Sequence, residues 1–555
     1  MNKIVLTLFT LVILSGSPSL FAQTSVKPYS FTNLPKIAKT SFKADTLNIL
    51  KFGAISDGLT LNTKSINDAI ITCNKRGGGV VVVPKGLWLT GPIELKSNVN
   101  LHLQENAILQ FTKDFNQYPL VAGNWEGLAQ MRNQSPLWAT NQQNIAITGK
   151  GIIDGAGDAW RMVKKEKLTE SQWSKLIASG GVVSEDKKTW YPTEKFFNAS
   201  KLKNPGEITP EKTLDFYNSI KDFLRPNLVV FTSCKRILLE GVTFQNSAAW
   251  NIHPLMCEDL TVRNVYAKNP WYAQNGDGID IESCKNVLIE GSTFDVGDDG
   301  ICIKSGRDAA GRKRGMPTEN VIIRNSTVYH AHGGFVIGSE MSGGARNIFV
   351  YDCSFIGTDI GLRFKTTRGR GGVVEKIFVK NINMIGIVGE AILFDMYYAA
   401  VDPIALKGDK REAPKVVLLP VTEETPTFKD FHISNVACDG ASKAVFIRGL
   451  PELSISNITL QNLSIKAQEG LDIQEAKNVT LNNVNLVVSD ANPLINIQNG
   501  NQINFKNIKY NAAQLLFRIS GERNSLIQSS GLDASKAKIK TEFLAGATEK
   551  SLQIK

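Results

Sequence analysis

A nine-residue pattern of polar and apolar positions recurs along most of the chain. It reads polar, apolar, any residue, apolar, polar, Asn or Gly, two variable positions and apolar. Such alternation predicts a strand with one buried face. Copies begin at Asn144, Arg236, Asp259, Asn286, Asn320, Asn347, Lys376, Asp430 and Asn478. From Arg236 on, successive copies start 23, 27, 34, 27 and 29 residues apart, which fits one coil of strand, turn and strand.

This repeat predicts an all-β protein, a single-stranded, right-handed parallel β-helix. A solenoid of this kind grows along one axis, so its length does not require several domains. We expect the Asn residues at the turn positions to stack, with their amides hydrogen-bonded along the axis.

The region before the repeats has a different pattern. Leu47–Phe52 and Val80–Val83 read as short strands, and Thr63–Lys75 reads as an amphipathic helix. Its predicted buried face consists of Ile66, Ala69, Ile70 and Cys73. A short helix here would cover the open apolar end of the first coil.

Three insertions interrupt the repeats, at residues 155–226, 307–317 and 390–426. Long loops on a rigid solenoid usually build its binding face, although each could be a tolerated surface insertion. We assign residues 1–22 to a signal peptide, 23–44 to a linker, 45–545 to the β-helix and 546–555 to a C-terminal tail.

The N-terminal stretch has the features of a secretory signal, with Lys3, an apolar run from Ile4 to Leu14 and a cleavage site after Ala22. The run is too short to span a membrane comfortably. No later stretch is long and apolar enough to do so. The sequence therefore predicts an exported protein, periplasmic or extracellular.

The net charge bears on the choice of partner, and the cysteine positions bear on disulfide formation. The formal net charge is +11 and the pI is near 9.1, which fits a polyanion. For an exported chain we expect an acidic polysaccharide rather than nucleic acid. Seven cysteines is an odd number. Because Cys234, Cys257 and Cys284 recur at one place in successive repeats, stacked buried thiols explain them better than disulfides.

The candidate chemistry is concentrated in Asn275–Ser305. It holds Asp277, Asp280, Asp298 and Asp299 among glycines, and Asp298 follows Asp277 by 21 residues. If that interval is one coil, the two carboxylates lie on neighbouring rungs, roughly 4.8 Å apart at the backbone. The glycines suggest a bulge or strand end at which Asp298 and Asp299 both face solvent. Paired carboxylates suit general acid and base catalysis, and a polar turn or a calcium site is the alternative.

Further polar residues follow on the next coils. His332 comes one coil after the aspartate pair, and Arg363 and Lys365 share a face of a later strand. Two cations without neighbouring acids suit a carboxylate ligand, and a solvent-facing pair is the alternative.

These motifs together resemble family 28 of the glycoside hydrolases, the polygalacturonases and their relatives. Asn275-Gly276-Asp277 resembles the family's Asn-Thr-Asp, and Gly297-Asp298-Asp299 its Gly-Asp-Asp. His332-Gly333 resembles Gly-His-Gly, and Arg363-Phe364-Lys365 resembles Arg-Ile-Lys. Gly276 and Ala331 depart from the family pattern, and these two departures resemble the motifs of the exo-acting bacterial branch.

The resemblance implies a pectin-lyase-like solenoid that hydrolyses α-1,4 bonds of galacturonic acid in plant cell-wall pectin, with inversion. It implies Asp298 as general acid, Asp277 and Asp299 as the residues that hold and activate water, and His332 as a tuning residue. Asn275, Arg363, Lys365 and Tyr398 are the implied substrate-binding residues. No cofactor or metal is implied, and we expect a monomer.

Two consequences of this assignment concern the site. A trio of close carboxylates should raise at least one of their pKa values. Inversion normally needs about 6.5–9.5 Å between acid and base, so side chains on adjacent rungs would have to diverge. The insertions around the site should wall off one end of the cleft, with the basic loop 307–317 meeting the substrate's terminal carboxylate. We therefore expect monosaccharide release from chain ends.

Three alternatives remain at this point. A rhamnogalacturonan hydrolase of the same family would share the catalytic residues. A calcium-dependent pectate lyase would use the aspartates as metal ligands. A solenoid that only binds polysaccharide would release no product.

Overall fold

A computed structural model describes residues 29–398 and 418–555. The proposed signal peptide and residues 399–417 of the third insertion lie outside the described residues. The chain divides into two compact units, residues 1–34 and 35–555. In the first, Ser30 and Asn33 make a reciprocal backbone pairing, and the Ser30 and Thr32 hydroxyls are 3.0 Å apart. Among the described residues, no helix is long and apolar enough to cross a membrane.

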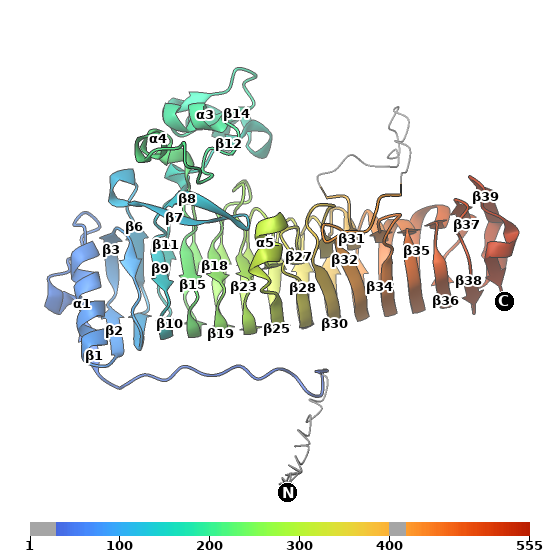
Figure 1. Cartoon of the computed structure of the whole chain (residues 1–555), viewed down its shortest axis with the longest axis horizontal. Coiled ribbons are helices and arrows are strands. Elements are labelled where there is room, and N and C mark those ends of the chain that lie inside the picture. The colour runs from blue at the N-terminus through green and yellow to red at the C-terminus, as the bar shows by residue number, and fades with distance from the viewer. Residues whose placement is uncertain (1–28, 399–417) are drawn as a thin grey trace, which may run out of the picture. The chain divides into compact units, whose positions relative to one another are not determined.

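The second unit is the predicted parallel β-helix (Figure 1). One row of strands carries the aspartates, and we call it the site sheet. It contains β4 (Ile93–Glu94), β9 (Leu137–Thr140), β15 (Val229–Thr232), β18 (Ile252–Leu255), β21 (Ile279–Glu282), β24 (Ile301–Lys304), β27 (Phe335–Ile337), β29 (Leu362–Lys365), β31 (Glu390–Asp395) and β33 (Lys443–Arg448).

A second row follows the nine-residue repeats. It contains β1 (Thr46–Asn48), β2 (Gly79–Val83), β5 (Val99–Leu103), β10 (Gln143–Gly149), β16 (Lys235–Glu240), β19 (Glu258–Arg263), β22 (Lys285–Glu290), β25 (Thr318–Arg324), β28 (Ala345–Ile356), β30 (Val373–Ile385), β32 (Thr427–Asp439), β34 (Ile455–Gln474), β35 (Ala476–Gln498) and β36 (Asn501–Tyr510). The later strands of this row are long because they continue through a turn into the next row.

A third row completes the early coils. It contains β3 (Gly86–Thr90), β6 (Ala107–Phe111), β11 (Ile152–Asp154), β17 (Thr243–Gln245), β20 (Tyr266–Lys268), β23 (Thr293–Asp295) and β26 (Thr327–Tyr329). The C-terminal coils add β37 (Ala513–Ser520), β38 (Ile527–Ser530), β39 (Ala537–Leu544) and β40 (Leu552–Ile554).

The interior is apolar and its turns are stacked, as the repeat predicted. Alternate strand positions are buried along every coil. All seven cysteines lie in the described part, are buried and carry free thiols, and the Cys257 amide donates to the Cys284 sulfur at 3.3 Å. Asn ladders run along the axis, for example from Asn483 through Asn462 to Asn435, at 2.8 and 3.0 Å. Their φ values are positive, a conformation that Asn tolerates well.

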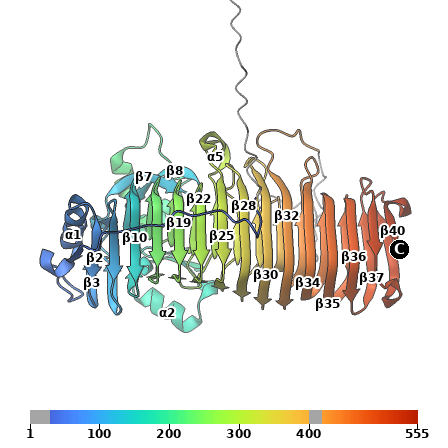
Figure 2. The same ribbon diagram turned by 90° about the horizontal axis from the view of Figure 1, so that it is seen from below.

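Helix α1 (Thr63–Lys75) lies at the first coil with Ile66, Ala69, Ile70 and Cys73 buried, as predicted (Figure 2). The insertion 155–226 contains α2 (Glu170–Ala178), α3 (Glu194–Ser200) and α4 (Leu214–Ser219). It also holds a small antiparallel sheet of β12 (Val163–Lys164), β14 (Thr189–Tyr191) and β13 (Val182–Val183). Thr169 caps α2, and Gln172 makes the reciprocal contact with the backbone of Thr169.

Several sequence predictions were wrong in detail. Only Thr46–Asn48 is a strand, and Ile49–Phe52 forms a 3-10 turn capped by the Asn48 side chain. The basic loop 307–317 contains a helix, α5 (Asp308–Arg314). The third insertion begins after β31, because Glu390–Asp395 pairs with β29. The supposed tail 546–555 belongs to the solenoid, since β40 pairs with β38.

Candidate active site

The predicted aspartates and His332 come together at the turns that precede consecutive strands of the site sheet, and Arg363 and Lys365 lie within the later strand β29. Asp277 lies before β21, Asp298 and Asp299 before β24, and His332 before β27. Backbone hydrogen bonds join these turns: the Gly278 amide donates to the Asp299 carbonyl, and the His332 amide to the Asp298 carbonyl, both at 2.9 Å. The solenoid therefore brings residues from separate coils into one column.

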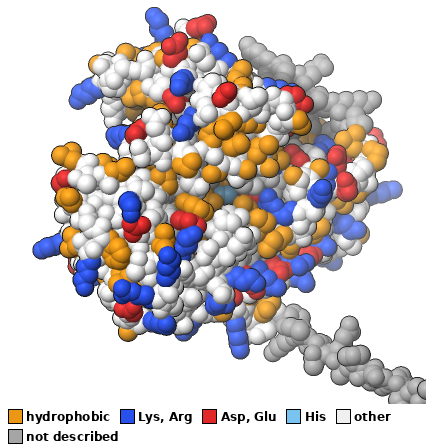
Figure 3. All heavy atoms as spheres, turned by 60° about the vertical axis from the view of Figure 1, so that its left-hand side comes forward, with side chains coloured by type: hydrophobic (Ala, Val, Ile, Leu, Met, Phe, Trp, Pro, Cys, Tyr) orange, Lys and Arg blue, Asp and Glu red, His pale blue; other side chains and the backbone are white. Residues whose placement is uncertain are grey.

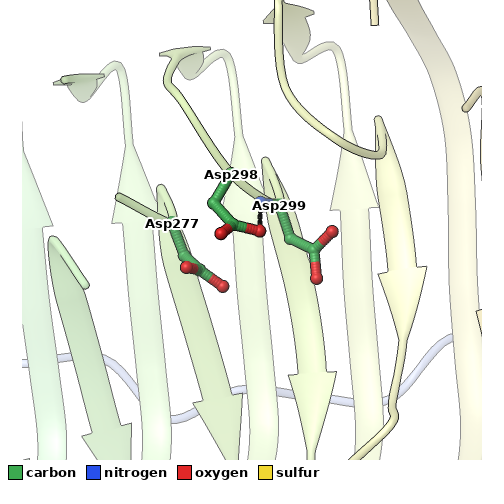
Figure 4. Close-up of side chains that lie close together, drawn as sticks. All are labelled: Asp277, Asp298 and Asp299. Atoms are coloured by element: carbon green, nitrogen blue, oxygen red, sulfur yellow. Dashed lines mark hydrogen bonds between the residues drawn. The ribbon is translucent and has the colours of Figure 1, made fainter. Parts of the chain in front are cut away.

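The three aspartates converge (Figure 4). One carboxylate oxygen from each lies within 4.8 Å of the others. Glycine is required beside them, because a Cβ on Gly300 would lie 2.4 Å from a Val328 methyl carbon. The expected divergence of these side chains is wrong. Backbone N–H groups of Asn275 and Asp299 donate to the Asp298 carboxylate at 3.2 and 3.0 Å and hold it beside its neighbours.

Asp299 is buried against two cations. Lys365 Nζ lies 2.7 Å from its Oδ2, and Arg363 Nη1 lies 3.3 Å from its Oδ1. Burial alone would raise the pKa of Asp299, but Lys365 and Arg363 outweigh it and hold that pKa far below the usual range. The expectations that Asp299 faces solvent and that the two cations have no neighbouring acid are therefore wrong.

Asp277 has the opposite environment. Burial, with the nearby carboxylates of Asp280 and Asp298, holds the pKa of Asp277 well above its usual range. Burial also raises the pKa of Asp280 to about 8, although the Lys304 ammonium opposes that shift. The expected raised pKa in the trio is thus found at Asp277. Asp277 and Asp280 together form a buried acid pair that retains a proton at neutral pH.

Lys304 and Glu340 were not predicted as site residues. Lys304 Nζ lies 2.9 Å from Glu340 and 3.5 Å from Asp280, and all three side chains are buried. Alternation along β24 places Lys304 on the outer face, and that was the only local signal for it.

His332 lies between two acids. Its Nδ1 is 3.1 Å from Asp298 Oδ1 and its Nε2 is 3.7 Å from Asp359 Oδ2. The hydrogen bond with Asp298 raises the pKa of His332, and burial opposes this only in part. The predicted tuning partner of Asp298 is therefore in contact with it.

Asn275 and Tyr398 lie at the margins of the site. The Asn275 side-chain oxygen accepts from Arg225 at 2.9 Å, so this side chain is engaged by the protein. Arg225 is buried and was missed, because it comes from the insertion 155–226, far away in sequence. The Tyr398 ring lies 4.9 Å from Lys365 Nζ and 5.9 Å from the Arg363 guanidinium carbon.

An antiparallel hairpin of β7 (Leu120–Trp125) and β8 (Leu128–Asn133) reaches the site from the N-terminal coils. Its tip residue Glu126 contacts Arg307, just before α5, at 3.2 Å. Trp125 stacks on Trp250 with 5.8 Å between ring centroids, and Trp250 lies 4.8 Å from Lys304 Nζ. The hairpin was not predicted. Figure 3 shows a hollow in the molecular surface with a histidine side chain inside it.

The two arginines of α5 bind the protein itself, whereas Lys313 is exposed. Arg312 donates to the carbonyls of Gly369 and Arg370 at 2.6 and 3.2 Å, and Arg314 pairs with Glu282 at 2.6 Å. These arginines therefore fasten α5 to the solenoid. The expectation that this segment meets a terminal substrate carboxylate is not supported by these contacts.

The donor set at the aspartates does not fit a divalent metal ion well. Both oxygens of Asp299 already face protein cations, and a metal would have to displace Lys365. Three convergent carboxylates flanked by ammonium and guanidinium groups are better suited to proton transfer.

Comparisons with known proteins agree with this geometry. The model of the glycosyl hydrolases family 28 matches residues 218–425, which include every predicted site residue. A probable polygalacturonase of Vitis vinifera is 28% identical over 435 residues, covering 77% of this chain and 75% of that protein. The exo-poly-alpha-D-galacturonosidase of Dickeya chrysanthemi is 27% identical, covering 79% and 71%.

Solved structures give the same result. A hyperthermoactive exopolygalacturonase from Thermotoga maritima superposes with a TM-score of 0.64 at 29% identity, covering 85% of this chain and 93% of that one. A family 28 exopolygalacturonase of Yersinia enterocolitica, at 21% identity and a TM-score of 0.65, covers 84% and 79% and supports the fold. The turns that carry the aspartates lie within the family match, and the relatives extend over most of the solenoid, so the chain is a glycoside hydrolase that is similar to family 28.

Proposed function

We propose that this protein is an exo-acting hydrolase of galacturonan that cleaves α-1,4 bonds of pectin. The observation that carries the proposal is the convergence of Asp277, Asp298 and Asp299 beside Arg363 and Lys365. The Dickeya relative and the Thermotoga structure bear the names of exo-acting galacturonan-cleaving enzymes, which supports the same substrate and mode.

In the proposed reaction, Asp298 gives its proton to the leaving glycosidic oxygen as the bond to the anomeric carbon breaks. Water attacks that carbon from the side of Asp277 and Asp299. Asp299 remains ionised beside its cations and orients the water. The Asp277–Asp280 pair takes the water's proton. The pair then releases that proton to solvent, and Asp298 takes up a proton from solvent, with His332 in contact with its carboxylate.

Arg363 is the residue proposed to bind a substrate carboxylate. Its Nε is buried and has no hydrogen-bond partner in the described ranges, while 18% of the side chain is exposed. Lys365 is buried and points at Asp299, so we propose that it holds Asp299 and does not bind the sugar directly. Tyr398 beside these cations is a candidate surface for the sugar ring, and Asn275 supports Asp298 through its backbone N–H.

Replacement of Arg363 with Ala should raise KM for oligogalacturonate about tenfold, because one charge-assisted contact is lost. The remaining binding should depend less on salt. Initial rates at several salt concentrations measure both effects. Arg346→Ala removes an exposed arginine on β28 that pairs with Glu319, and it should change neither quantity. An unchanged KM for Arg363→Ala would contradict a substrate-binding role.

The hairpin β7–β8 supports the exo mode. From its contact with Arg307 and its Trp125–Trp250 stack, we infer that the hairpin closes one end of the site. A polymer cannot pass through a site closed at one end, so cleavage is confined to chain ends. We propose release of monosaccharide.

The experiment that tests the proposed function is product analysis on polygalacturonate and on rhamnogalacturonan. We expect galacturonic acid as the early product from polygalacturonate, with viscosity falling slowly relative to reducing ends. A variant with the hairpin tip shortened should lower viscosity faster. Mixed oligomers early in the reaction of the intact protein would show an open cleft, and preferential cleavage of rhamnogalacturonan would favour that alternative.

The same reaction followed by proton NMR reports the stereochemistry. The similarity to family 28 implies inversion, so the β anomer should be released first. The carboxylate oxygens lie within 4.8 Å of one another, which is closer than inverting sites usually show. An α anomer would assign retention. A product that absorbs in the ultraviolet and a loss of activity with chelator would instead indicate a calcium-dependent lyase.

We further propose that the protein is exported and acts as a monomer on acidic cell-wall polysaccharide. The N-terminal sequence and the net charge of +11 support this proposal. Size-exclusion chromatography and the N-terminal sequence of the exported protein test it.

A further inference from the structure

Asp298, His332 and Asp359 form a column of side chains across three consecutive coils. Ile301 pairs with Phe335, and Phe335 pairs with Leu362, in the site sheet. Each column residue lies three positions before one of these strand residues. The backbone reinforces the column, since the Asp359 amide donates to the Ala331 carbonyl at 2.8 Å. Parallel register therefore fixes Asp359 beside His332.

The two nitrogens of His332 face different acids. Nδ1 lies 3.1 Å from Asp298, and Nε2 lies 3.7 Å from Asp359. When Nε2 carries a proton toward Asp359, Nδ1 is free to accept a hydrogen bond from protonated Asp298. When the imidazole is charged, it donates toward both acids. In either state, one proton lies between Asp298 and His332.

Other charges also face this imidazole. Asp299 lies on the same turn as Asp298, and the Arg363 Nη1 donates to the His332 carbonyl at 3.3 Å. The hydrogen bond with Asp298 raises the pKa of His332, and the charges of Asp298, Asp299 and Asp359 add to that increase. Because 50% of the Asp359 side chain is exposed to solvent, its contribution to the raised pKa of His332 is modest.

We propose that Asp359 is a positioning residue that orients His332 and helps the Asp298–His332 pair keep its proton as pH rises. The catalytic part of this inference rests on the proposed role of Asp298 as the acid. The contact itself is independent of that role, so the two are tested separately.

The first test is the pH profile of Asp359→Asn. Removing the negative charge should lower the pKa of His332, so the alkaline limb of kcat/KM should move down by about half a pH unit. KM at the pH optimum should stay unchanged, because Asp359 is not proposed to bind substrate. An unmoved alkaline limb, or a change confined to KM, would overturn the inference.

Asp295→Asn is the matched control. Asp295 contacts Nδ1 of His330 at 3.0 Å, an acid–histidine pair that is exposed and outside the site. This variant should leave the pH profile of activity unchanged. A shift of equal size in both variants would show a general charge effect and would contradict a specific role of Asp359.

The second test uses no substrate. With histidine labelled at Cε1, NMR titration follows the five histidines of the intact protein, and His332→Gln assigns one signal. Asp359→Asn should lower the pKa of that signal, and Asp295→Asn should not. A lowered pKa together with no activity on polygalacturonate would refute the proposed function and leave the contact standing. An unchanged pKa would refute the inference itself.

Discussion

Asp298→Asn is expected to lower kcat on galacturonan at least about a hundredfold, because the amide cannot donate a proton to the leaving oxygen. The fold should be kept. Asn has nearly the same shape, and its side-chain oxygen can still accept the Asp299 N–H that Asp298 accepts at 3.0 Å. Steady-state rates at the pH optimum measure the loss, and circular dichroism with thermal melting checks the fold.

The control for this prediction is again Asp295→Asn, which makes the same chemical change on β23 outside the site. It should retain wild-type kcat. Near-wild-type activity of Asp298→Asn would remove Asp298 from the catalytic role and point to Asp277, whose pKa is already raised by burial, as the acid.

The alignment of Asp277, Asp298 and His332 was predictable from sequence because the solenoid is periodic. Once one coil is recognised, Asp277, Asp298 and His332 must lie on successive turns, and the structure places them there. Arg363 and Lys365 share an outer face for the same reason, through strand alternation. Because the coils repeat, the number of residues between two side chains tells which coils they lie on and therefore how close they are along the solenoid axis.

The missed residues come from segments without that periodicity. Trp125 and Glu126 reach the site on a hairpin, and Arg225 arrives from the insertion 155–226. The direction of a loop depends on its own packing, which no local pattern records. The contact of Lys365 with Asp299 was not predicted, for a related reason. Its partner Asp299 lies 66 residues earlier in the chain, so the pairing is invisible until register is known.

The buried contact between Asp299 and Lys365 is the basis of the largest stability effect we expect. Both side chains are nearly inaccessible to solvent, and 2.7 Å separates Nζ from Oδ2. Removing one partner of a buried pair leaves the other as an uncompensated charge in the protein interior, which stabilises ions much less than water does. Lys365→Met nearly keeps the length of the side chain and removes its charge. The variant therefore separates the energetic effect of the lost charge from the effect of lost packing.

Lys365→Met should lower the free energy of unfolding at pH 7 by about 3 kcal/mol, the lower end for a broken buried pair, because Arg363 still contacts Asp299. Denaturant unfolding measures it. Lys429→Met is the control, since Lys429 makes a 3.2 Å contact with Glu375 at the surface, with 41% of its side chain exposed. Exposed pairs contribute at most about 1 kcal/mol.

The pH dependence of this loss has a definite sign. The folded-state pKa of Asp299 is depressed by Lys365 and Arg363 against the effect of burial, so its contribution to stability is present above the unfolded pKa of about 3.9. That contribution fades as pH falls toward the depressed folded pKa. The difference in the free energy of unfolding between Lys365→Met and the wild type should therefore be largest near pH 7 and decrease below about pH 4. Equal stabilities at pH 7, or a gap that widens in acid, would show that Lys365 does not stabilise an ionised Asp299.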